Sequence, residues 1–295
     1  MYTVDQETPD AHTDGIWAVA WASGANMVIT GSVDESIHCW HASTGDLIRS
    51  LPGHVLGVTS VTTDAAGTVA LSAGLDGQLF RWDLATGQSL QRWQTEPAQT
   101  WGVTLAPDGQ GFATGGEGGI VRLWSVASDT PVQEVKASPS FAMAVAYSPN
   151  GKYLACGTKA GNVDVFDIES GKLLHSLSGH ATVVRTVAFS PDSTRLYSGS
   201  DDHRVQVYDA RHGNLIAAFS GHSSWVLSVA IHPDGDQIAT ASGDHTVKLW
   251  STRMRQCTET LSHHQDHVWD VAFNDQGNHL VSVSEDRSLR WYRAL

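Results

Sequence analysis

Histidine, hydroxyl and carboxylate side chains recur together along this chain at fixed spacings. A serine or threonine follows each histidine of the set after 18 residues, and an aspartate follows it after 22. These are the residue types of a catalytic triad, in which histidine takes the proton of a hydroxyl nucleophile and a carboxylate orients the histidine. Nucleophilic catalysis is therefore the first chemistry to weigh.

Repetition argues against that chemistry, because an active site needs one such set and most units of this chain carry one. A buried aspartate needs hydrogen-bond donors, and the histidine, the hydroxyl and the indole N–H of a tryptophan ten residues further on supply them. We therefore expect no catalytic residues and no cofactor. The sequence instead predicts structural tetrads, complete in three units as His12, Thr30, Asp34 and Trp40; His54, Ser72, Asp76 and Trp82; and His222, Thr240, Asp244 and Trp250.

The secondary-structure elements that position these side chains can be inferred from a column of large aromatic residues spaced 42 residues apart. Seven such periods account for 294 of the 295 residues. A fixed period in this range signals a repeat architecture whose single unit cannot bury its own core. The seven rings are Trp40, Trp82, Trp124, Phe166, Tyr208, Trp250 and Tyr292.

Each period contains recurring β-branched and aliphatic positions separated by turn signals such as Pro107-Asp108-Gly109, which is typical of four short strands. Four-stranded antiparallel sheets repeated radially predict an all-β, seven-bladed propeller, here one domain over residues 1–295. The seventh unit lacks its outer strand. We expect residues 2–7 to complete blade seven, because an unclosed ring would leave an open sheet edge.

Composition narrows the function further. The net charge of −13 disfavours direct nucleic-acid binding, because an acidic surface repels phosphate. The first residues show no basic-then-apolar leader and no apolar run reaches 18 residues, so we expect neither a signal peptide nor a membrane contact. Three cysteines without motif spacing suit a reducing compartment, which predicts a cytoplasmic location, with the nucleus as a second one.

Two units and one histidine cluster depart from the pattern. In units three and four Glu96 and Ser138 replace the histidine, and Gly118 and Ala160 replace the aspartate, so we expect packing alone to hold these blades. The densest histidine cluster, residues 263–267, suggests a metal site. Because its second histidine already belongs to a tetrad column, we expect no metal centre there.

Function should depend on the columns that do not repeat, since a column that varies does not serve the common blade environment. We expect these positions to bind partners through an exposed apolar patch larger than the roughly 300–600 Å² of a typical monomer. The alternative is that several rings fold back over the channel mouth. The predicted partner-binding residues, called the rim below, are Trp17, Leu75, Trp101, Phe141, Met143, Arg185, Asp201, Trp225, Leu227 and Trp269. Three rim acids, Glu117, Asp201 and Glu285, are expected to receive a basic side chain.

The segment Gly53-His54 … Ser72 … Asp76 … Trp82-Asp83 resembles the WD-repeat pattern, and the resemblance implies a non-catalytic propeller with hydrogen-bonded tetrads. Longer segments, such as residues 220–229 and 264–273, resemble the small WD-repeat subunit of the superkiller (Ski) complex, which also occurs in the RNA polymerase II-associated factor complex. That resemblance implies a scaffold that grips short peptides with an arginine and a bulky apolar residue. It implies a tetratricopeptide-repeat protein and an RNA helicase as partners.

The resemblance and the composition favour some functions over others. The resemblance predicts a scaffold in exosome-linked mRNA decay, with a role in transcription elongation. The alternative is a scaffold of another large assembly, such as a ciliary, axonemal or meiotic recombination complex. An enzyme is disfavoured because the 42-residue period leaves no room for inserted loops, and direct RNA binding is disfavoured by the net charge.

Overall fold

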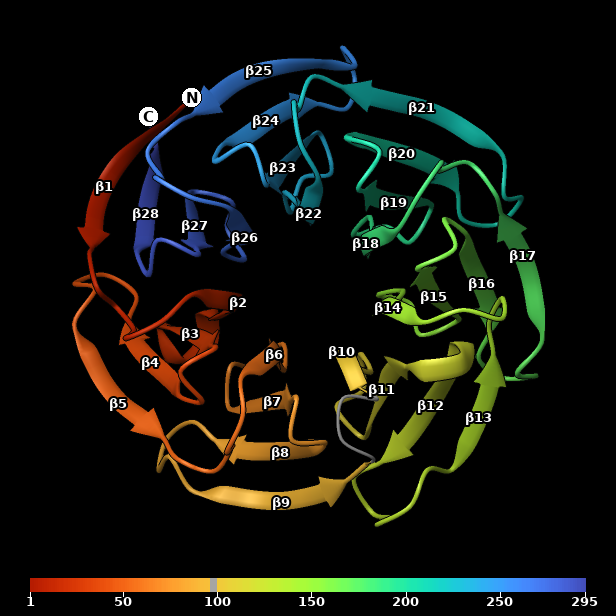
Figure 1. Cartoon of the computed structure of the whole chain (residues 1–295), viewed down its shortest axis with the longest axis horizontal. Coiled ribbons are helices and arrows are strands. Elements are labelled where there is room, and N and C mark those ends of the chain that lie inside the picture. Colours follow the sequence, from red (N-terminus) through yellow and green to blue (C-terminus); the bar gives the residue numbers. More distant parts are fainter. Residues whose placement is uncertain (96–99) are drawn as a thin grey trace.

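The computed structural model describes residues 1–95 and 100–295. Within these residues the chain forms seven four-stranded antiparallel sheets arranged radially around a central channel (Figure 1). The predicted seven-bladed all-β propeller is confirmed.

In blades one to six the strands follow the chain outward from the channel, and in blade seven β1 is the outer strand. Blades one to four contain β2 (Ile16–Ala22), β3 (Met27–Ser32), β4 (Ile37–His41) and β5 (Leu47–Leu51); β6 (Val58–Thr63), β7 (Val69–Gly74), β8 (Gln78–Asp83) and β9 (Ser89–Gln94); β10 (Thr100–Leu105), β11 (Gly111–Gly116), β12 (Ile120–Ser125) and β13 (Gln133–Lys136); and β14 (Ala142–Tyr147), β15 (Tyr153–Thr158), β16 (Val163–Asp167) and β17 (Leu173–Leu177). Blades five to seven contain β18 (Val184–Phe189), β19 (Arg195–Ser200), β20 (Arg204–Asp209) and β21 (Leu215–Ser220); β22 (Val226–Ile231), β23 (Gln237–Ser242), β24 (Val247–Ser251) and β25 (Gln256–Leu261); and β26 (Val268–Phe273), β27 (His279–Ser284), β28 (Leu289–Ala294) and β1 (Tyr2–Thr8). Two 3₁₀ turns also occur in the described ranges, η1 (Ser23–Ala25) and η2 (Glu117–Gly119). Among the residues that the structure describes, no helix has the length and apolarity needed to cross a membrane.

The ring column and a second 42-residue column form the core between neighbouring sheets. The second column consists of Val19, Val61, Val103, Val145, Val187, Val229 and Val271, all buried. All seven rings of the 42-residue column are buried. The packing is between blades as well as within them: Trp82 of blade two, for example, shares a buried cluster with Ile29 of blade one. One blade therefore cannot bury its apolar face alone, which is the physical basis of the repeat.

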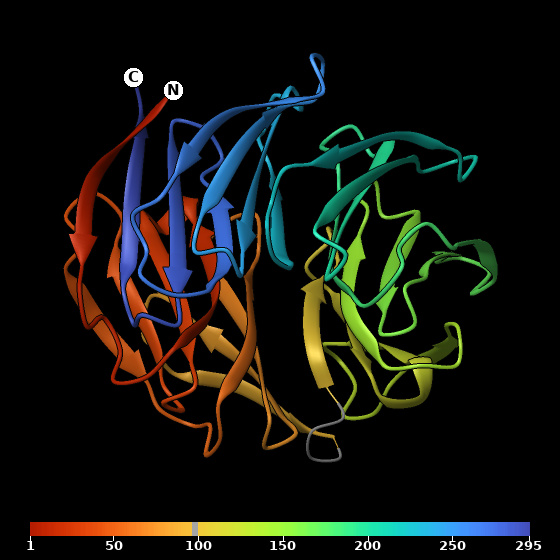
Figure 2. The same ribbon diagram turned by 45° about the horizontal axis from the view of Figure 1, so that its top comes forward.

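Strand β1 closes the ring from the other end of the chain. It pairs antiparallel with β28 as the outer strand of blade seven, and the two termini lie side by side (Figures 1 and 2). Tyr2 is buried in the same cluster as Tyr292. The predicted closing strand is confirmed, and it extends one residue beyond the predicted segment, to Thr8.

The innermost strand pair of every blade carries a β-bulge at the same repeat position. In blade one the register shifts between Ile16 and Ala18, which leaves Trp17 unpaired, and the same shift recurs in the other six blades. Bulges re-aim a side chain and sharpen local twist. Here they turn one variable residue per blade toward the channel.

Candidate functional site

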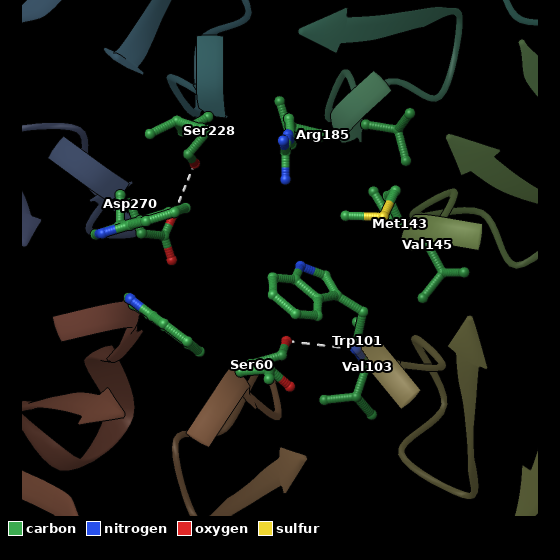
Figure 3. Close-up of a pocket in the computed structure, with 17 residues that line it drawn as sticks. Ser60, Trp101, Val103, Met143, Val145, Arg185, Ser228 and Asp270 are labelled. Atoms are coloured by element: carbon green, nitrogen blue, oxygen red, sulfur yellow. Dashed lines mark hydrogen bonds between the residues drawn. The ribbon is translucent and has the colours of Figure 1, made fainter. Parts of the chain in front are cut away.

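The bulge residues of all seven blades converge on one end of the channel. They line a cavity of about 180 Å³ together with the small residues that follow them in sequence (Figure 3). The seven bulge residues are Trp17, Thr59, Trp101, Met143, Arg185, Leu227 and Trp269. Because the bulge is the same in every blade while the side chain differs, the chemistry of the channel mouth depends on this column.

Three tryptophans pack against one another at this channel mouth. The ring of Trp17 lies 5.9 Å from that of Trp101 and 5.7 Å from that of Trp269 between centroids, both tilted. Such contacts are favourable for aromatic pairs. All three side chains are only partly exposed, so the alternative of rings folding over the channel mouth applies to them.

Glu285 holds two of these indoles in place. Its carboxylate accepts a hydrogen bond of 2.6 Å from the indole N–H of Trp269 and one of 3.3 Å from that of Trp17. Gly15 makes room for it, because a Cβ at that position would lie 2.4 Å from a Glu285 carboxylate oxygen. Both indoles donate to Oε2, and a carboxylate can accept further hydrogen bonds, so the expectation that Glu285 receives a partner's basic side chain stays a prediction.

Trp225 is the exposed ring of the rim. Its side chain is 41% exposed and lies beneath the Arg185 guanidinium, 5.6 Å from the ring centroid, a cation–π arrangement. Arg185 also forms a two-pronged ion pair with Asp201, with both N···O distances 2.9 Å. Asp201 is thus paired within the chain, and Glu117 is the exposed rim acid for which no ion pair occurs in the described residues.

The remaining rim residues contribute less exposed surface than the sequence suggested. Met143 and Leu227 are buried, at 9% and 7% exposure, while Leu75 and Phe141 are partly exposed. Packing at the channel mouth therefore covers part of the expected apolar patch, and its area stays a prediction. The rim is a partly filled, mixed surface with Trp225 standing out of it.

Asp270 was missed as a channel residue by sequence reasoning. It occupies the position held in the other blades by Ala, Ser, Gly or Thr, and an acid in a column of small residues is the signal that marks it. Its carboxylate accepts a hydrogen bond of 2.6 Å from the Ser228 hydroxyl (Figure 3). It accepts a second one, of 2.9 Å, from the backbone N–H of Val19. It therefore ties blade seven to blades six and one. Burial raises the pKa of Asp270 from 3.8 to about 6, despite these hydrogen bonds.

Replacing Asp270 by serine, the residue of blades two and six, should remove a pH dependence of stability. Between about pH 4 and pH 6 the folded chain holds a proton that the unfolded chain has released, so the wild type loses stability relative to D270S as the pH rises through this window. The loss is at most about 3 kcal/mol, which is the free energy that corresponds to a pKa raised from 3.8 to about 6. Urea unfolding of both proteins at pH 4.5 and 7.5 measures it, and an unchanged difference between the two pH values would refute the assignment.

The histidine, hydroxyl and aspartate columns meet in turn clamps away from the channel. In blade six the Trp250 indole N–H donates to Thr240 Oγ1 at 2.8 Å, that hydroxyl lies 2.6 Å from His222 Nε2, and Nδ1 lies 2.8 Å from Asp244. Each contact has one donor and one acceptor when the histidine is neutral with its proton on Nδ1: the Thr240 hydroxyl then donates to Nε2, and Nδ1–H donates to Asp244. Burial alone raises the pKa of Asp244, but hydrogen bonds led by that from His222 outweigh it and hold the pKa well below its usual range.

Four other blades have a clamp of the same kind. Blades one and two join the same four residue types, through His12, Thr30, Asp34 and Trp40 and through His54, Ser72, Asp76 and Trp82. Blades five and seven keep the histidine links, with tyrosine in the ring column, through His180, Ser198 and Asp202 and through His264, Ser282 and Asp286. Burial lowers the pKa of His54 and of His264, which agrees with neutral rings.

Blade four has a different clamp, so the expectation of packing alone is wrong there. Asp164 is fully buried and accepts hydrogen bonds from the backbone N–H of Ser138 at 2.5 Å and from the hydroxyls of Ser138 and Ser176. In blade three the Trp124 indole still donates to Thr114 at 3.0 Å, and Glu96 lies outside the described residues. The aspartate of blade four comes from a non-repeating column, which hid its role in the sequence.

Comparison with known families agrees with this geometry. A family profile described as the nucleolar protein 10-like, N-terminal domain, a β-propeller, matches residues 59–250, more than half of the chain. The profile of the WD domain, G-beta repeat, matches residues 5–41 and 255–293. The chain belongs to the WD-repeat β-propeller family, whose members generally serve as protein-interaction scaffolds.

Individual relatives match over short stretches. A stretch of 51 residues is 40% identical to WD repeat-containing protein VIP3 of Arabidopsis thaliana and covers 16% of each chain. Another of 44 residues is 36% identical to Denticleless protein homolog of Danio rerio and covers 15% of this chain and 7% of that protein. The chain thus spans less than a fifth of the length of these relatives.

Proposed function

We propose that this chain is a non-catalytic scaffold whose rim grips short segments of protein partners, as the WD-repeat subunit of a Ski-type complex. In that role it supports exosome-linked mRNA decay in the cytoplasm and transcription elongation in the nucleus. The observation that carries the proposal is the set of seven bulge residues. They occupy equivalent positions in the seven blades, vary in side chain and line one channel mouth. The Ski-like segments at residues 220–229 and 264–273 border this surface.

The proposed partner segment contains an arginine and a bulky apolar residue. The exposed face of Trp225 provides an apolar contact for the bulky residue, and exposed aromatic residues are common binding hot spots. Exposed Glu117 provides a carboxylate for the arginine. The resemblance assigns such a segment to a tetratricopeptide-repeat protein, with an RNA helicase in the same assembly.

The clamps support a scaffold over an enzyme. Each of the five His–Asp pairs of the repeat columns has its histidine ring buried and bonded to a hydroxyl of the same blade. A nucleophile in such a set would have no access to a substrate. The net charge of −13 likewise supports protein partners over direct nucleic-acid contact.

The long match to the nucleolar protein 10-like profile favours a second candidate. In this second candidate function the same propeller is a scaffold subunit of another large assembly, such as a ciliary, axonemal or meiotic recombination complex. The rim and its peptide-binding role are the same in both candidates, so only the identity of the partners separates them.

Affinity purification of the tagged chain from its own cells tests the proposal. Recovery of a tetratricopeptide-repeat protein and an RNA helicase is the expected result, and imaging of a fluorescent fusion should show cytoplasmic and nuclear signal. Recovery of a different assembly instead would reject the Ski-type role while keeping the scaffold. Recovery of no stable partner would reject the scaffold as well.

A further inference from the structure

Two histidines and one aspartate meet on the rim between blades six and seven. The ligand atoms that His245, Asp266 and His267 can offer all lie within 4.8 Å of one another. His245 Nε2 lies 3.9 Å from Asp266 Oδ1, and the two imidazole rings are 5.7 Å apart between centroids at an angle of 63°. His245 comes from the turn between β23 and β24, and the other two precede β26, so the sequence did not reveal the group.

Two turn clamps hold the three residues in register. His245 follows Asp244, the clamp aspartate of blade six, and Asp266 lies two residues after His264, the clamp histidine of blade seven. The Asp266 carboxylate also accepts a hydrogen bond of 2.7 Å from the backbone N–H of His267. The backbones that carry the three side chains are therefore fixed, while the side chains of His245 and Asp266 remain about half exposed.

The repeat itself does not require this trio. The equivalent positions between blades five and six are His203, Ser224 and Trp225, which offer one imidazole and no carboxylate. Between blades one and two they are Glu35, Leu56 and Gly57. The blade environment thus does not explain why two imidazoles and a carboxylate meet between blades six and seven.

We propose that His245, Asp266 and His267 form a binding site for a borderline divalent cation, zinc first. Imidazole nitrogen and carboxylate oxygen are zinc ligands, at about 2.0–2.2 Å from the metal, which places tetrahedral ligands about 3.3 Å apart. The His245–Asp266 distance of 3.9 Å is close to that value, so small side-chain rotations complete the geometry. Three protein ligands leave a coordination position open for an incoming ligand. His267 lies beside Trp225 and Trp269, at 6.2 and 6.3 Å between centroids, so the metal would sit on the rim.

The proposed site differs from the cluster within residues 263–267, where the sequence predicted no metal centre. Within residues 263–267 His264 is committed to the Asp286 clamp and unavailable, as expected. The missing second imidazole comes from the neighbouring blade instead. Metal binding of this kind does not depend on the proposed partner, because all three ligands belong to the chain alone.

Isothermal titration of the untagged full chain with zinc chloride tests the proposal. We expect one zinc ion per chain, and His245→Asn and His267→Gln should each weaken binding by at least the roughly 10–100-fold change that loss of a supporting residue causes at metal sites. Asparagine tolerates the left-handed backbone of residue 245, whose φ is 69°.

His203→Asn is the matched control, because His203 occupies the same turn position in blade five with the same φ of 69°. It should bind zinc as the wild type does. The proposal would be overturned if the control weakened zinc binding as much as the ligand variants do. It would also be overturned if His245→Asn and His267→Gln each bound zinc as tightly as the wild type, or if a folded wild-type chain with an intact thermal transition bound no zinc.

Discussion

Replacing Asp244 by alanine is expected to lower the free energy of unfolding by about 2–4 kcal/mol. The carboxylate accepts hydrogen bonds from His222, from the backbone N–H groups of Ser223 and Thr246, and from the Thr246 hydroxyl at 2.6 Å. Its loss leaves the buried His222 ring and a turn without their acceptor. Buried donors without partners cost more than the lost bond itself. Urea unfolding monitored by tryptophan fluorescence measures the change.

Asp236→Ala is the control for that experiment. Asp236 is exposed and pairs with Arg253, whose side chain is 80% exposed, and exposed pairs contribute about 0–1 kcal/mol. We expect its unfolding free energy to stay within about 0.5 kcal/mol of wild type. If Asp244→Ala is no more destabilising than Asp236→Ala, the clamp does not stabilise the blade and the structural interpretation of the repeated histidine, hydroxyl and aspartate is wrong.

Replacing Trp225 by valine is expected to reduce partner recovery at least tenfold, with little change in stability. Truncation of an interface hot spot costs about 2 kcal/mol or more, which corresponds to roughly 30-fold in affinity. Blade five carries Val183 at the equivalent position, so valine is compatible with the blade. Arg185 keeps its ion pair with Asp201. Quantitative mass spectrometry of material co-purified with each variant measures the binding.

Leu215→Ala is the matched control for the rim. Leu215 is 56% exposed on the outer strand of blade five, so it removes an exposed apolar side chain away from the channel. Its partner recovery should equal that of the wild type. Equal losses for both variants would mean that exposed apolar surface in general, and not the rim, retains the partners. A large fall in thermal stability for Trp225→Val would show that this ring belongs to the core.

The period of 42 residues made the fold and its closure predictable, because it assigns every residue to a blade and a column. Repeating columns have one environment, so their burial follows from residue type. In non-repeating columns the burial of a residue does not follow from its type. The exposure of Trp17, for example, depends on its contacts with Trp101 and Trp269 across the channel, and no spacing along the chain predicts those contacts. The exposure of single rim residues, such as Met143 and Leu227, was therefore overestimated.

The same limit explains the two polar groups that the sequence left out. Asp164 of blade four lies where the other blades have histidine, phenylalanine, arginine, glutamine or lysine, so no column indicated a clamp. Asp270 accepts its hydrogen bond from Val19 of blade one, the neighbouring blade, whereas Arg185 pairs with Asp201 within blade five. Contacts that depend on the neighbouring blade require the closed ring.

Hydrogen exchange of the chain, measured free and within its purified assembly, tests most directly the claim that the rim is the partner-binding face. We expect slower exchange in the assembly at the rim segments, residues 223–227 and 265–269, with unchanged exchange in the outer strands β9, β17 and β21. Protection confined to the outer strands, with the rim segments exchanging as in the free chain, would contradict it.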